Sequence, residues 1–151
     1  MFSIECAPLS DFEEHAEIVE ALNRANVAVS NDLPSRRPSY QFDYREVGVE
    51  TVKRLFAYAD IAVTNTPVGA DGSFAPIASS GEWVVFPLEG LRSYLEASSP
   101  SGLRAYREFG SLDRIPDAMG STLGVEDQLA MATLECLSFC ETHQLLLAFS
   151  W

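Results

Sequence analysis

Two cysteines and a histidine near the end of the chain have the side chains and the spacing that a metal site needs. Cys136, Cys140 and His143 are four and three residues apart, so a helix would present all three on one face. Thiolates and imidazole are ligands that zinc prefers, and Cys6 is available as a fourth. The alternative is that the cysteines are small core residues and that His143 caps a helix end. Because most structural zinc sites use cysteines in short knuckles rather than along one helix, we predict no metal and no cofactor.

His15 is the second residue with catalytic potential. Asp11 lies four residues before it and Glu14 directly before it, and a nearby carboxylate can orient a histidine. A general base also needs a nucleophile or substrate within hydrogen-bond reach, and the chain has no Gly-x-Ser-x-Gly motif. We therefore interpret His15 as a surface residue. The alternative is a small enzyme of unknown reaction, with its site near His15 and residues 65–81.

The chain has few residues that could bind a phosphate group. Neither the dinucleotide-binding glycine pattern nor a phosphate-binding loop occurs, and Lys53 is the only lysine. Arg36 with Arg37, and Arg104 with Arg107, are the only arginine clusters. Such arginines can grip a carboxylate or phosphate through two hydrogen bonds, but they more often pair with neighbouring acids. These clusters therefore do not favour a nucleotide-binding protein.

Carboxylates gather in one segment near the N-terminus. Glu13, Glu17 and Glu20 share one face of a predicted helix, and Arg24 is placed to pair with Glu20. Like charges four residues apart destabilise a helix by a few tenths of a kcal/mol, which about equals one favourable pair. Such a stripe is the more common mark of a solvated helix face, and the alternative is a surface kept for a cationic partner. The predicted partner-binding residues are Asp11, Glu13, Glu14, Glu17 and Glu20.

The elements that position these residues follow from local signals in the first half of the chain. Residues 1–6 read as a strand, and Ser10 with Glu13 forms a capping-box pattern that predicts a helix to about residue 25. The residues expected to form its buried stripe are Phe12, Ala16, Val19 and Leu22. The further predictions are a brief strand at 27–30, a loop at 31–39, an alternating strand at 40–47, a helix at 50–58, a strand at 61–66 and a long loop at 65–81.

The second half of the chain is predicted to be mostly helical. A buried strand at 82–86 precedes a helix opened by Pro87, and Ser99 with Pro100 opens a short helix that Gly110 ends. Residues 111–123 are irregular. Residues 125–142 form a helix that is apolar on nearly every side, which is typical of a central buried helix, and residues 144–151 form a strand. We predict an α+β fold, with a mostly antiparallel sheet of about four or five strands and about five helices.

Composition narrows the classes of partner. The 151 residues contain 22 acidic and 10 basic side chains, a net charge of −12, which disfavours direct binding to nucleic acids and to anionic membranes. The 47% hydrophobic content supports one globular domain over residues 1–151. Three cysteines are an odd number, which indicates reduced thiols, and no signal peptide or membrane-spanning run is visible. We therefore expect a cytoplasmic protein.

Three functional hypotheses follow. The first is a small acidic inhibitor of the immunity or antidefence type, which blocks a basic protein such as a nuclease by presenting carboxylates where phosphates would bind. The second is the small enzyme near His15. The third is an assembly subunit that pairs through its last strand, residues 145–151, as an open sheet edge. The surplus of carboxylates and the lack of a catalytic motif favour the first.

Overall fold

The computed structural model describes residues 2–24, 26–42, 78–80, 83–86, 88–115 and 123–150. Within these ranges the chain is a helix-covered antiparallel sheet, so the predicted α+β class is confirmed. The strands are β1 (Phe2–Ala7), β2 (Ser39–Phe42), β3 (Ala78–Ser80), β4 (Trp83–Phe86) and β5 (Leu146–Ser150). The helices are α1 (Ala16–Arg24), α4 (Leu88–Ser98), α5 (Pro100–Phe109) and α7 (Val125–His143), with the 3-10 turns η1 (Leu9–Phe12) and η2 (Leu112–Arg114).

The number of helices differs from the prediction, and several predicted elements lie outside the described residues. The described ranges hold four α-helices, fewer than the five or so expected. The helix predicted at 50–58, the strand at 61–66 and most of the loop at 65–81 lie outside the described residues. None of the described helices is long and apolar enough to cross a membrane.

The sheet has the strand order β2-β1-β5-β4-β3, and every neighbouring pair is antiparallel. The C-terminal strand β5 therefore lies in the middle, and its prediction as an open edge is wrong. Residues 146–149 are buried on both faces of the sheet, which is why they form a continuous apolar run. An edge strand would instead alternate or carry charges.

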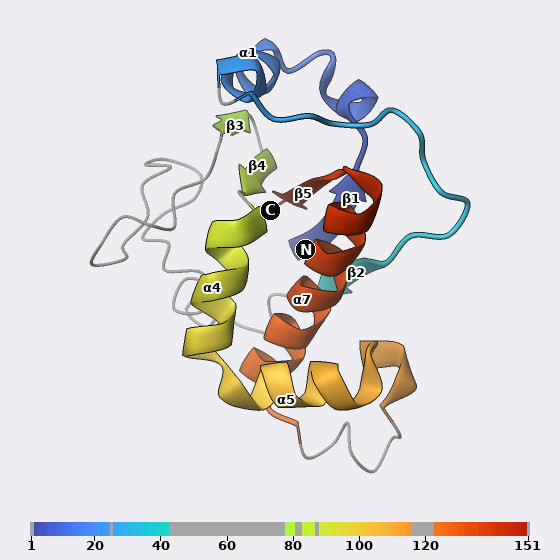
Figure 1. Ribbon diagram of the computed structural model, residues 1–151, viewed down its shortest axis with the longest axis vertical. Helices are drawn as coiled ribbons and strands as arrows, with labels where there is room; N and C mark the ends of the chain where they lie inside the picture. The colour runs from blue at the N-terminus through green and yellow to red at the C-terminus, as the bar shows by residue number, and fades with distance from the viewer. Residues whose placement is uncertain are drawn as a thin grey trace.

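Two helical layers cover the two faces of this sheet (Figure 1). Ile4 and Cys6 of β1, with Leu147 and Phe149 of β5, pack in the core that includes α4 and α7. The alternate residues of the same strands pack on the other face, in the core that includes η1 and α1. The residues of this second core are Ala7, Phe12, Ile18, Leu22, Val85, Leu146 and Ala148.

The N-terminal helix begins later than the capping-box pattern predicts. Ser10 lies inside η1, its backbone N–H donates to Asn31 Oδ1 over 3.1 Å, and α1 starts only at Ala16. The break changes which residues face the core, so Ile18 is buried while Ala16 is exposed. The predicted stripe is therefore correct at Phe12 and Leu22 and wrong at Ala16; Val19 is only half-buried.

Helices α4, α5 and α7 lie where their start and stop signals place them. Pro100 occupies the first turn of α5, and Gly110 ends it in the left-handed conformation with φ of 74°. Helix α7 ends at Gln144, which is also left-handed with φ of 55°. Most of α7 between Leu129 and Cys140 is buried, because the helix lies between β1, α4 and α5.

The connection from α1 to β2 is extended and contains no strand before residue 39. The strand predicted at 27–30 is therefore absent. Instead the backbone N–H of Ser30 donates to the carbonyl of Gln144 over 2.7 Å, which ties this segment to the end of α7. In β2, Tyr40 and Phe42 are half-buried and Gln41 is exposed, as the alternation predicts; residues 43–47 lie outside the described ranges.

Candidate protein-binding surface

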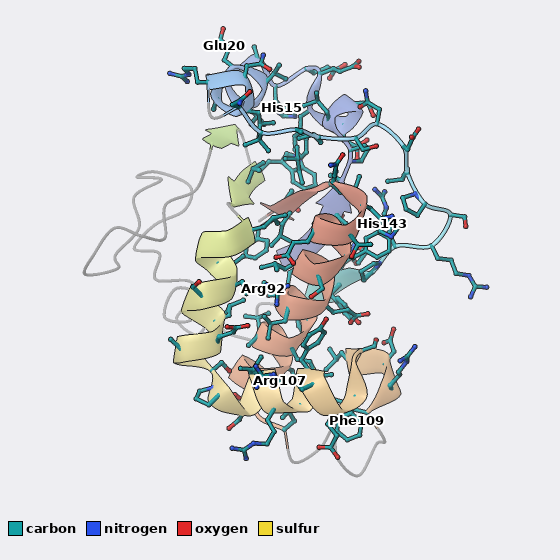
Figure 2. All side chains as sticks on the ribbon, in the orientation of Figure 1. His15, Glu20, Arg92, Arg107, Phe109 and His143 are labelled. Atoms are coloured by element: carbon teal, nitrogen blue, oxygen red, sulfur yellow. The ribbon has the colours of Figure 1, made fainter. Side chains whose placement is uncertain are left out.

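The five predicted partner-binding carboxylates are all exposed. Asp11 belongs to η1, Glu13 and Glu14 to the turn that follows, and Glu17 and Glu20 to α1. We call residues 11–20 the acidic segment. It lies at one end of the long axis of the molecule, opposite α5 (Figure 1). Figure 2 shows Glu20 and His15 at this end and Arg107 and Phe109 at the other.

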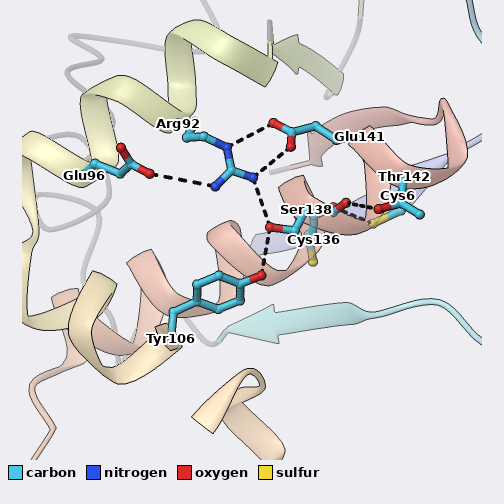
Figure 3. Close-up of polar contacts among 8 residues, drawn as sticks. All are labelled: Cys6, Arg92, Glu96, Tyr106, Cys136, Ser138, Glu141 and Thr142. Carbon is cyan, nitrogen blue, oxygen red and sulfur yellow. Dashed lines mark hydrogen bonds and ion pairs between the residues drawn. The ribbon is translucent and has the colours of Figure 1, made fainter. Parts of the chain in front are cut away.

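The acidic segment is not neutralised by neighbouring cations in the part of the chain that the structure describes. The ion pairs there are those of Arg92 with Glu96 and with Glu141 (Figure 3), and neither includes a residue of the acidic segment. Glu20 and Arg24 do not form the predicted pair, although both are exposed. Among the described residues, the carboxylates thus form a concentrated group of negative charges at this end.

The apolar side of the acidic segment holds it firmly on the sheet. Phe12, Ile18 and Leu22 are almost completely buried in the core beneath it. The ring of Phe12 meets that of Trp83 edge-on, with centroids 5.6 Å apart and planes at 90°. Because the inward face is fixed by this packing, the carboxylates on the outward face are held in a defined arrangement before any partner binds.

Sequence reasoning missed two apolar residues near the acidic segment. Val27 and Leu33 are 39% and 45% exposed, the large hydrophobic residues most open to solvent among those described. Their segment is joined to η1 by the hydrogen bond from Ser10 to Asn31, two residues before Leu33. Exposed apolar residues beside charged ones are typical of interfaces with an apolar centre and a polar rim. Only the tertiary structure reveals them, since in the sequence they resemble core residues.

His15 lies at the start of α1 and is half-buried. Its carbonyl accepts the backbone N–H groups of Ile18 and Val19, which form the first turn of the helix. Its ring contacts that of Phe12 edge-on, with centroids 6.1 Å apart. Of the loop at 65–81, the other part of the alternative enzyme site, the structure describes only residues 78–80, which form β3 and lie against α1.

The cysteines predicted as alternative zinc ligands come together, but the histidine does not join them. Cys6, Cys136 and Cys140 are completely buried and unpaired by disulfides. His143 is exposed at the end of α7, where its ring stacks on Phe139 with centroids 4.3 Å apart. Across the described ranges, no three His, Cys, Asp or Glu side chains are arranged to hold a metal ion.

The arginines of the two predicted clusters differ in their contacts and in their exposure. Arg37 donates from Nη1 to the carbonyl oxygen of Cys6 over 2.8 Å, so it fastens the 26–38 segment to β1. Arg36 and Arg107 are exposed. Arg104 lines a cavity of about 200 Å³ on the outer side of α5, together with Glu108 and Phe109. A carboxylate in the same cavity offsets the charge of Arg104, which makes it a poor site for a phosphate.

Comparisons with known proteins do not narrow these possibilities. Neither protein-family models, nor curated proteins, nor solved structures gave a match to this chain.

Proposed function

We propose that this chain is a small acidic cytoplasmic binding protein, an inhibitor of the immunity or antidefence type. It blocks a basic protein partner, such as a nuclease, by covering the partner's cationic surface with carboxylates. The observation that carries the proposal is the acidic segment, in which five carboxylates are exposed and unpaired within the described residues.

Two physical arguments support this function. A group of fixed carboxylates attracts a cationic protein over distances of roughly a Debye length, about 8–10 Å at physiological salt, and so raises its association rate. The exposed Leu33 and Val27 supply apolar area next to the charges, which slows dissociation once contact is made. The combination suits a protein partner better than a small substrate, since the five carboxylates are exposed along η1, the turn after it and α1.

The test compares two variants that remove the same number of charges. Glu17→Gln with Glu20→Gln alters the acidic segment, and Glu108→Gln with Asp113→Asn alters exposed acids of α5 and η2. Each variant and the unchanged protein are used to capture partners from the cytosol of the native host. We expect a basic protein to be retained by the unchanged chain and by the control, and to be lost or bound about tenfold more weakly by the first variant.

Two outcomes would contradict the proposal. One is a stoichiometric partner that is itself acidic. The other is a basic partner whose affinity falls equally in both variants, which would show that only the net charge matters and that the acidic segment is not the binding surface.

A further inference from the structure

Three thiols from distant parts of the chain meet in the core between the sheet and α7. Cys6 lies in β1, while Cys136 and Cys140 lie one turn apart in α7. The Sγ of Cys6 is 3.3 Å from the carbonyl oxygen of Cys136, and it is within hydrogen-bonding reach of the thiols of both helix cysteines. Figure 3 shows Cys6 beside Cys136 where β1 crosses the helix. The three thiols therefore share one buried cluster, where they can react with one another as well as pack.

The surroundings shift the pKa values of the three thiols in different directions. When Cys6 is ionised, the S–H groups of Cys136 and then of Cys140 donate to its sulfur, and these hydrogen bonds lower the pKa of Cys6 well below its usual value. Burial opposes the effect, while the charges of Arg37 and His143 assist it. The same contacts raise the pKa of Cys136 and Cys140, which therefore stay protonated. The cluster thus combines one nucleophilic sulfur with two adjacent thiols.

The extended 26–38 segment lies against the cluster. The carbonyl oxygen of Pro38 is 3.9 Å from the Sγ of Cys136, and Arg37 holds the carbonyl of Cys6. This segment has no regular secondary structure. It is held by separate hydrogen bonds, such as that from Ser30 to Gln144, and by the packing of Val29 on the second core. Local opening of so few contacts costs much less than global unfolding, and it admits a molecule as small as a peroxide.

We propose that this cluster is a redox-modification site, in which a small peroxide links Cys6 to one of the two α7 cysteines by a disulfide. The Cys6 thiolate attacks one peroxide oxygen, the O–O bond breaks, and with one proton taken up the products are a sulfenic acid and water. The neighbouring thiol then attacks the sulfenic sulfur, the S–S bond forms and a second water leaves. Two thiols are oxidised and one hydrogen peroxide is reduced to two waters.

The expected consequence is a covalent link between β1 and α7. Cys6 and Cys136 are separated by 130 residues, so the link constrains nearly the whole unfolded chain and raises the midpoint of denaturation. The remaining cysteine stays a thiol and can exchange with the disulfide, which makes the link reversible by dithiols. This inference does not depend on the proposed binding function.

The experiment counts free thiols after the native protein is treated with hydrogen peroxide, quenched and denatured. Glutathione at the same concentration serves as a reference for oxidation by the peroxide alone. We expect the unchanged chain to fall from three thiols to one, and peptide mapping without reductant to join Cys6 to Cys136 or Cys140. The Cys6→Ala variant should keep both of its thiols, and dithiothreitol should restore all three in the unchanged chain.

Single variants on the helix keep the test decisive if Cys6→Ala does not fold. Of Cys136→Ala and Cys140→Ala, at least one must still form a monomeric disulfide with Cys6. The proposal is overturned if the unchanged chain keeps three free thiols when glutathione is fully oxidised. It is also overturned if both helix variants keep two free thiols, or if the only disulfides join two chains.

Discussion

At the scale of single residues, Tyr40 shows how the fold controls ionisation. Its hydroxyl donates to Oε2 of Glu135 on α7 and lies 3.3 Å from the Oγ of Ser111. Burial and then the hydrogen bond to the Glu135 carboxylate raise the pKa of Tyr40 well above its usual value. The phenol therefore remains protonated and keeps β2 joined to α7 when other tyrosines ionise.

This shift predicts a specific alkaline behaviour. Because the folded pKa is higher than the unfolded value of about 10, the stabilisation from Tyr40 is complete below pH 10 and is lost as the pH rises toward the folded pKa. The measurement is a denaturation midpoint recorded from about pH 9 to about pH 11 for the unchanged chain and for Tyr40→Phe. We expect the difference between the two to shrink across this range, starting from about 1 kcal/mol. A difference that is constant with pH would contradict the assignment.

At the scale of elements, α5 and α7 approach each other closely where α5 has a glycine. A Cβ on Gly102 would lie 2.8 Å from Ser99 Oγ, 3.0 Å from the Cβ of Ala130 and 3.1 Å from the carbonyl oxygen of Asp127. The last of these belongs to the helix backbone and cannot rotate away. Gly102 thus sets the distance between the two helices, and through α7 it supports the wall of the core.

Gly102→Ala should therefore destabilise the protein, against the usual preference of helices for alanine. The usual gain is roughly 0.5–1 kcal/mol, and overpacking at a close helix contact costs about 1–3 kcal/mol, so we expect a net loss of about 1–2 kcal/mol. Urea denaturation measures it. Ser101→Ala, an exposed change in the same turn, serves as the control and should alter the free energy of unfolding by less than about 0.5 kcal/mol. Equal stability of the two variants would show that the helices can separate freely.

The elements that the sequence predicts correctly are those whose ends are marked by nearby residues. Pro100 and Gly110 mark the two ends of α5 by backbone geometry alone, and no distant residue is needed to read them. The start of α1 was wrong because Ser10 offers a capping pattern that the chain does not use. Its backbone is instead bonded to Asn31, twenty-one residues later, and such a contact leaves no local signal.

The sequence does contain a signal for the central position of β5, although the prediction placed this strand at an edge. The run from Leu145 to Phe149 has no polar residue, which is typical of a strand covered on both faces and so argues against an edge. The composition predicts that the five carboxylates of the acidic segment are exposed, and all five are exposed in the structure. The exposure of Val27 and Leu33 depends on tertiary contacts and could not be predicted. The sequence offers the meeting of Cys6 with the helix cysteines only as an alternative, in the form of a zinc site, because the contact between β1 and α7 leaves no local signal.

At the scale of the whole molecule, both the size of the net charge, −12, and the positions of the acidic residues matter. The two cores fix α1 on one side of the sheet and α4 and α7 on the other, so the acidic segment and α5 lie at opposite ends (Figure 1). The ion pair of Arg92 with Glu141 joins α4 to α7, the pair with Glu96 lies within α4, and both contribute little to the field around α1. A cationic protein should therefore be drawn to the end that carries the acidic segment.

The most direct test of this account is the salt dependence of association with the partner recovered by capture. We predict that the association rate constant falls by about tenfold or more between roughly 0.05 M and 0.5 M salt, while the dissociation rate changes little. With Glu17→Gln and Glu20→Gln together, the slope should become clearly shallower, and with Glu108→Gln and Asp113→Asn it should stay near that of the unchanged chain. An association rate that does not vary with salt would contradict the central claim that the acidic segment selects the partner.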